Sequence, residues 1–169
     1  MNSPESSNNN KISPRVVLTD PVHLLAFGLG LGLSPVAPGT VGSLLGVVIA
    51  WLTLDLGLYA QIATAIGLVL AGIWICDNSA RRIGQHDPGG IVWDEIAAMY
   101  IVLLFAPASI PAWLLAFVLF RFFDIVKPWP IRDLDHSIGG GLGIMLDDLV
   151  AALYAAILLA LLVHYVGGG

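Results

Sequence analysis

Carboxylates in unusual places are the first feature of this sequence with chemical meaning. Six charged residues lie inside or directly beside long apolar stretches: Asp94, Glu95, Arg121, Asp124, Asp147 and Asp148. One acid in the middle of an apolar span costs about 2.5–3.5 kcal/mol on insertion scales. Five acids facing lipid would therefore approach the whole stability of a small domain. We expect these five carboxylates to face one another inside the protein.

Two bases, Arg121 and Lys127, lie close to the five acids in the sequence and are too few to neutralise them. Like charges that are packed together repel or take up protons, so a divalent cation is their natural complement. Oxygen ligands without cysteine and with few histidines suit Mg²⁺. We predict a Mg²⁺ site made by a subset of five acids: Asp94, Glu95, Asp124, Asp147 and Asp148.

Two of these acids are neighbours in the chain and cannot point the same way. Asp147 and Asp148 differ by about 100° around a helix, so one is expected to bind the ion and the other to orient water or a neighbour. Taken singly, Asp94 or Asp147 is explained equally well by the preference for negative charge at a helix N-terminus. Function is the better explanation only for the converging set.

A second candidate site is the segment Ser34-Pro-Val-Ala-Pro-Gly-Thr-Val-Gly-Ser43, which combines small residues, hydroxyls and a helix start. Backbone N–H groups at a glycine-containing helix N-terminus attract phosphate. The candidate phosphate ligands are Ser34, Gly39, Thr40 and Ser43, with Thr40 as the expected N-cap. An ordinary loop and cap explains the segment slightly better, with Gly42 and Gly46 at a helix-packing spacing.

Two polar connections supply further candidates for contact with a phosphate or an anionic head group. His86 and Asp87 lie in the first connection, and Lys127 and Arg132 lie in the second. A solvated loop histidine explains His86 equally well. Lys127 and Arg132 also satisfy the rule that cytoplasmic loops of membrane proteins are positively charged.

The elements that must position these residues are apolar helices. The chain is 57% hydrophobic and 11% charged with a mean hydropathy of +0.87, whereas soluble proteins average about 25% charged residues. Five stretches approach the roughly 20 residues that a span needs: 41–58, 60–76, 91–107, 110–126 and 144–166. Residues 22–33 are apolar but short, which favours an interfacial or re-entrant segment. We predict an all-α polytopic membrane bundle of four or five spans.

Basic residues flank alternate connections, which places those connections in the cytoplasm and the acids at the cytoplasmic ends of their spans. Residues 1–20 are rich in Ser, Asn and Pro and are predicted to be a disordered cytoplasmic tail. Residues 21–169 are predicted to form a single membrane-embedded domain. The single cysteine, Cys76, excludes an internal disulfide and a cysteine-rich zinc site.

Four blocks of this sequence together resemble the phosphatidylglycerophosphatase A family. They are Leu33-Ser-Pro-Val-Ala-Pro-Gly-Thr-Val-Gly-Ser43, His86-Asp-Pro-Gly-Gly-Ile-Val-Trp-Asp-Glu95, Phe120-Arg-Phe-Phe-Asp-Ile-Val-Lys-Pro-Trp-Pro-Ile-Arg132 and Gly140-Gly-Leu-Gly-Ile-Met-Leu-Asp-Asp148. The resemblance implies a bacterial inner-membrane, Mg²⁺-dependent phosphatase that converts phosphatidylglycerophosphate to phosphatidylglycerol. It marks the same five acids as site residues, with Asp87, Arg121 and Lys127 in support.

The expected chemistry is hydrolysis by an aligned water, with one carboxylate as general base. An aspartyl-phosphate intermediate is a less favoured alternative. Another membrane lipid phosphate is the alternative substrate, and an ion-coupled transporter is the alternative from a different class, although a transporter would distribute its acids through the membrane. The expected partners are the bilayer and its phospholipid, with no nucleic acid and no obligate protein partner.

Overall fold

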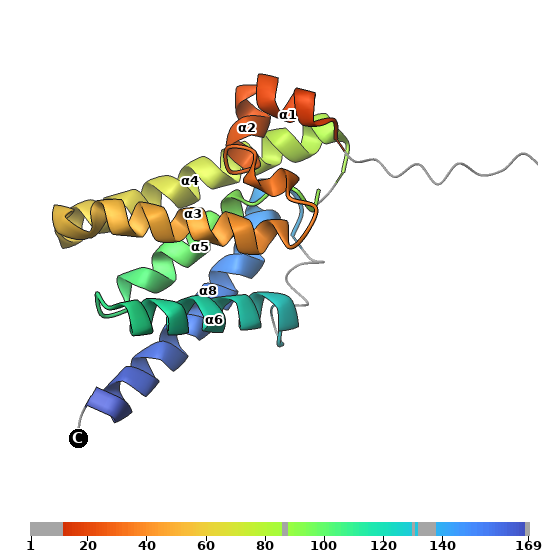
Figure 1. The fold of residues 1–169 in the computed structure, drawn as a ribbon. Helices are drawn as coiled ribbons and strands as arrows, with labels where there is room; N and C mark the ends of the chain where they lie inside the picture. The colour runs from red at the N-terminus through yellow and green to blue at the C-terminus, as the bar shows by residue number, and fades with distance from the viewer. Residues whose placement is uncertain (1–11, 86–87, 130, 132–137, 168–169) are drawn as a thin grey trace, which may run out of the picture.

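The computed structural model describes residues 12–85, 88–129, 131 and 138–167, and every regular element in them is helical. The α-helices are α1 (Pro14–Thr19), α2 (Pro21–Ala26), α3 (Pro38–Thr53), α4 (Leu58–Ile83), α5 (Trp93–Leu104), α6 (Ile110–Val126) and α8 (Gly140–Gly167), and two 3₁₀ turns are η1 (Leu31–Leu33) and η2 (Leu54–Leu56). The prediction of an all-α fold is confirmed for this part of the chain (Figure 1).

Among the described residues, three stretches are long and apolar enough to cross a membrane: Pro38–Leu56, Leu58–Ile83 and Gly140–Tyr165. Helix α6 begins and ends at the predicted bounds but has 17 residues, and α5 has only 12. Twelve residues rise about 18 Å, which is well short of a hydrocarbon core of about 30 Å. The membrane character of the bundle is therefore supported, and four or five spans stay a prediction.

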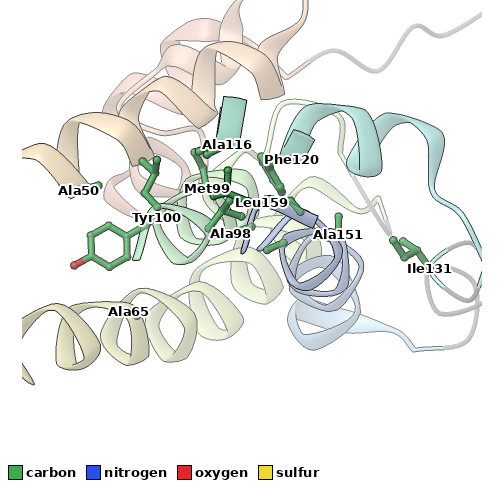
Figure 2. Packing of buried hydrophobic residues seen from close by; sticks show 14 residues of the cluster. Ala50, Ala65, Ala98, Met99, Tyr100, Ala116, Phe120, Ile131, Ala151 and Leu159 are labelled. Atoms are coloured by element: carbon green, nitrogen blue, oxygen red, sulfur yellow. The ribbon is translucent and has the colours of Figure 1, made fainter. Parts of the chain in front are cut away.

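Helix α5 is the centre of the bundle, and its shortness follows from that position. Its residues Ile96 to Tyr100 are completely buried, and α3, α4, α6 and α8 all pack against it. Figure 2 shows Ala98, Met99 and Tyr100 of this helix among the buried side chains of the surrounding helices. A helix that is shielded on all sides by protein does not need the length of a lipid-facing span.

Small residues allow α3 to lie directly against α5. A Cβ atom added at Gly42 would lie 2.6 Å from the Cβ of Val92, and one added at Gly46 would lie 2.6 Å from the carbonyl oxygen of Ile96. Ala50 continues the same buried face one turn later. The helix-packing explanation of the glycine spacing is therefore confirmed, and this packing is typical of membrane helices.

The segment predicted to be interfacial or re-entrant, residues 22–33, is not one helix. Helix α2 ends at Ala26, and positive φ angles follow at Gly28 (54°), Leu29 (59°) and Gly30 (93°) before the turn η1. Left-handed residues interrupt a helix, so the chain turns here. The interfacial or re-entrant placement stays a prediction.

The predicted tail covers residues 1–20, but its described part contains α1, whose Val17 is completely buried. Asp20 caps α2 by accepting from the N–H of Val22 at 2.8 Å, and it pairs with Arg82 of α4 at 2.7 Å. His23 Nδ1 lies 2.8 Å from the Ser79 hydroxyl oxygen. These contacts, with the packing of α1 on α2, fasten α1 and α2 to the end of α4. The disordered tail stays a prediction.

Candidate active site

Three carboxylates from two helices, each with a buried oxygen atom, meet at one end of the bundle. Asp94 and Glu95 lie in the first turn of α5, and Asp148 lies in α8 and is 3% exposed. One carboxylate oxygen from each residue lies within 4.8 Å of the other two. The start of α5 is held by Trp93, whose indole N–H donates to the Leu68 carbonyl of α4 at 2.9 Å. We call Asp94, Glu95 and Asp148 the acidic triad.

The acidic triad fits a hard divalent cation. Asp94 Oδ1, Glu95 Oε2 and Asp148 Oδ2 are buried and have no hydrogen-bond partner within the described residues. Buried acceptors without donors are costly, and a cation removes that cost. Two oxygens bound to one Mg²⁺ at about 2.1 Å lie roughly 3 to 4 Å apart, so the triad needs only small side-chain movements to reach this geometry.

Arg121 joins the acidic triad to the start of α3. Its Nη1 lies 2.6 Å from Asp124 Oδ2 and 3.9 Å from Glu95 Oε1, and it donates to the Ser43 hydroxyl at 3.4 Å. Its Nε is buried and has no partner in the part of the chain that the structure describes. A guanidinium that keeps one unused donor beside buried acids is suited to binding an anion.

Lys127 and Asp147 form a second pair beside the triad, with Lys127 Nζ 2.6 Å from Asp147 Oδ2. Lys127 ends α6 with a φ of 43°, and its N–H donates to the Phe123 carbonyl. Asp147 and Asp148 therefore have different surroundings, since Asp147 faces Lys127 and Asp148 belongs to the triad. Of the five predicted acids, three form the possible ligand cluster, while Asp124 and Asp147 are each engaged by a base.

The first turn of α3 closes the other side of the site. A Cβ atom on Gly39 would overlap Glu95 Oε1 and lie 3.2 Å from Arg121 Nη1. Ser43 donates its hydroxyl to the Gly39 carbonyl at 2.8 Å and accepts from Arg121. Thr40 lies beside Arg121 in an open groove. Gly39, Thr40 and Ser43 are thus brought to the site, as a phosphate-binding segment requires.

Two other predictions for this segment concern the N-cap of α3 and the position of Ser34. Thr40 is not the N-cap of α3, and that prediction was wrong: the helix begins at Pro38, and Ala37 precedes it with a φ of 47°. Proline is favoured at the first helical position, which moves the helix start before Thr40. Ser34 donates to the Val36 carbonyl at 2.8 Å inside its own loop, and no contact joins it to the acidic triad.

The predicted contacts of His86, Asp87 and Arg132 lie outside the described residues. Sequence reasoning missed Asp77, which accepts from the N–H of Gly141 at 3.1 Å and so caps the start of α8. The signal in the sequence was the spacing of four residues from Asp77 to Arg81, which is typical of an ion pair on a helix. The structure shows this pair, with Arg81 Nε 3.0 Å from Asp77 Oδ2. By fixing the start of α8, Asp77 helps to position Asp147 and Asp148.

Apolar helices long enough to cross a membrane, with carboxylates and bases gathered at one end, define a helical protein of membrane character with a candidate site for charged ligands. The family described as phosphatidylglycerophosphatase A matches residues 24–163. The chain therefore belongs to the phosphatidylglycerophosphatase A family.

Individual relatives agree with this assignment. The chain is 42% identical over 154 residues to phosphatidylglycerophosphatase A of Escherichia coli, covering 89% of this chain and 88% of the relative. It is 44% identical over 151 residues to phosphatidylglycerophosphatase A of Haemophilus influenzae, covering 88% and 92%. It is also 40% identical over 147 residues to a Bacteroides thetaiotaomicron protein named as a candidate phosphatidylinositol-3-phosphatase, covering 81% and 90%. No solved structure matches the chain.

Proposed function

We propose that this protein is a phosphatidylglycerophosphatase, which hydrolyses phosphatidylglycerophosphate to phosphatidylglycerol and phosphate. The family match and the names of two relatives support this activity. The observation that carries the proposal is the buried acidic triad beside Arg121, because a phosphatase must bind an anion next to a group that activates it for attack.

Mg²⁺ is the proposed cofactor, held by Asp94, Glu95 and Asp148. The donors are all carboxylate oxygens, three of which have no hydrogen-bond partner among the described residues, and hard cations prefer such ligands. A bound Mg²⁺ would polarise a phosphate oxygen and activate water for attack.

The paired acids have a different proposed role, which is to orient the bases. Asp124 holds Arg121 and Asp147 holds Lys127, each at 2.6 Å, so that both cations can face the negative charge that develops on the phosphate. The first turn of α3, with Gly39, would present backbone N–H groups to the same anion.

A carboxylate of the site would accept a proton from the attacking water while the water oxygen forms a bond to phosphorus. The bond between phosphorus and the glycerol oxygen breaks, and the glycerol oxygen takes up a proton to leave as an alcohol. Attack by an aspartate to give an aspartyl-phosphate is the alternative route. The two routes differ in whether a phosphorylated protein forms. With a ³²P-labelled substrate, a rapid acid quench traps a hydroxylamine-sensitive phosphoprotein if an aspartate attacks phosphorus, and yields only free labelled phosphate if water attacks directly.

The proposed location is the bacterial inner membrane, with the site facing the cytoplasm. Arg81 and Arg82 end α4, and Lys127 ends α6, so basic residues gather at the end of the bundle that carries the acidic triad. This distribution follows the positive-inside rule. Residues 21–169 are proposed to act as one membrane-embedded domain, since Leu68 packs against both buried hydrophobic clusters.

The test uses the purified full chain in detergent with phosphatidylglycerophosphate, and released phosphate is measured with Mg²⁺ or with EDTA. Asp94→Asn and Asp148→Asn should each lower turnover by about a hundredfold or more, because each removes a charge that would hold the ion. Asp55→Asn is the matched control, because Asp55 is exposed in η2, beyond the end of α3 that is opposite the site. Turnover that resists EDTA and both site variants would refute the proposed mechanism.

A second substrate is favoured by one specific observation, the Bacteroides relative and its printed name. Phosphatidylinositol 3-phosphate is also a lipid phosphomonoester and presents the same dianion to the site. Comparing kcat/KM for the two lipids decides between them. A higher value for phosphatidylinositol 3-phosphate would replace the proposed substrate and keep the proposed chemistry.

A further inference from the structure

An open groove of about 300 Å³ runs along the outer side of α6 and passes Arg121. Its apolar lining is formed by Phe117, Val118, Phe122, Ile125 and Val126, and Thr40 of α3 lies on the opposite wall. Thr40 and Arg121 are the polar residues of this lining. The groove therefore combines a long apolar surface with a single cationic side chain.

The groove exists because α3 and α6 have different partners. Helix α3 packs mainly on α5, and α6 packs mainly on α8. Arg121 of α6 reaches across to Ser43 of α3 and Glu95 of α5. Val118, Phe122 and Ile125 remain more than half exposed and face the surroundings of the bundle.

We propose that this groove is the lateral access path of the lipid substrate, with one acyl chain lying along α6 and the phosphate facing Arg121. This inference rests on the proposed function and adds the orientation of the substrate. An anionic head group with an apolar tail is complementary to a cationic side chain beside an apolar groove.

The dimensions agree with one acyl chain. Residues 117–126 of α6 rise about 14 Å, and one leaflet contributes about 15 Å of hydrocarbon to a bilayer. The guanidinium of Arg121, which lines the groove, supplies N–H donors for the head group. A lipid in this position stays in its own leaflet while its phosphate reaches the acidic triad.

The experiment fills the groove and compares two substrates. Val118→Trp places an indole in the path of the acyl chain, and Val48→Trp is the matched control, since Val48 is a similarly exposed valine on α3 outside the groove (47% against 61%). Phosphate release is measured from dioleoyl phosphatidylglycerophosphate and from the same head group without acyl chains. We expect the ratio of kcat/KM for the acylated over the deacylated substrate to fall about tenfold in Val118→Trp and to stay unchanged in Val48→Trp.

An unchanged ratio in Val118→Trp, or an equal fall in both variants, overturns the access path and leaves the proposed function intact. A wild-type protein that releases phosphate from neither substrate refutes the proposed function instead. Photocrosslinking of the wild type with a phosphatidylglycerophosphate that carries a diazirine in one acyl chain decides the access path without hydrolysis, and also if Val118→Trp fails to fold. Labels within residues 117–126 support the proposal, and labels only elsewhere overturn it.

Discussion

Gly39→Ala is the sharpest test of the site, because one added methyl group reaches the acidic triad directly. The new Cβ atom would lie 2.9 Å from Glu95 Cδ and 3.2 Å from Arg121 Nη1. Carbon atoms in contact lie about 3.5–4.0 Å apart, so the Glu95 carboxyl group must withdraw by roughly 0.6–1.1 Å. A misplacement of about 1 Å at a reacting centre costs up to about a hundredfold in rate.

Activity should therefore fall by about tenfold to a hundredfold, while the free energy of unfolding falls by about 0–2 kcal/mol. Overpacking costs about 1–3 kcal/mol, and replacing glycine by alanine in a helix returns up to about 1 kcal/mol. The assay measures kcat/KM for phosphatidylglycerophosphate together with thermal unfolding in detergent. Gly67→Ala in α4 is the control, since nothing lies within 4 Å of its added Cβ atom.

A double-mutant cycle separates a displacement of Glu95 from a general disturbance of the fold as the cause of the lost activity. Glu95→Asp shortens the side chain and makes room for the methyl group, so Gly39→Ala should cost much less activity in that background than in the wild type. Equal losses in both backgrounds, or wild-type activity in Gly39→Ala, would show that the Gly39 and Glu95 contact does not position the catalytic carboxylate.

Three further results are expected. Asp148→Asn should raise the Mg²⁺ concentration needed for half-maximal phosphate release by at least about tenfold, and excess Mg²⁺ should restore wild-type activity after EDTA treatment. Gly46→Ala should lower the free energy of unfolding by about 1–3 kcal/mol, measured by denaturation in detergent, because its Cβ atom would lie 2.6 Å from the Ile96 carbonyl oxygen. Desolvation raises the pKa of Asp20, but hydrogen bonds from the backbone N–H groups of Val22 and His23, with the charge of Arg82, outweigh it and hold that pKa below its usual value. The ionised Asp20 carboxylate therefore stabilises the fold above its unfolded pKa, and this stabilisation is lost as the pH falls through the lower folded pKa. The melting temperatures of the wild type and of Asp20→Asn, measured between about pH 3 and pH 7, should converge at the acid end of this range.

The helix bounds show what hydropathy can and cannot predict. Helix α6 was predicted exactly from Ile110 to Val126 because Ser109 caps its start and Lys127, followed by a proline, ends it. Helix α4 continues to Ile83, seven residues past the predicted end of its apolar stretch. Hydropathy marks where lipid contact ends, whereas this helix continues through polar residues until Gly84 adopts a left-handed conformation with a φ of 75°.

The sequence predicts that the acids lie together, but not which of them form the possible ligand cluster and which pair with bases. The cost of charge in lipid predicted that the carboxylates would meet, and the structure brings Asp94, Glu95 and Asp148 together. That Asp124 and Asp147 face bases depends on how far each helix is rotated about its axis. Sequence spacing fixes the angle between residues of one helix and says nothing of the angle between helices, which close contacts such as Gly42 against Val92 determine.

The charge of the site makes the proposed binding of substrate depend on the cation. Five carboxylates and two bases leave a formal excess of three negative charges at the candidate site itself. A phosphate monoester brings up to two more negative charges, so it would meet net repulsion at the acids even though Arg121 and Lys127 attract it. A divalent cation held by the triad would lower this excess from three negative charges to one and would put positive charge next to the phosphate, in addition to the two bases. The surplus of acids is therefore what makes the affinity for substrate depend on the cation, and substrate alone should bind weakly to the cation-free protein.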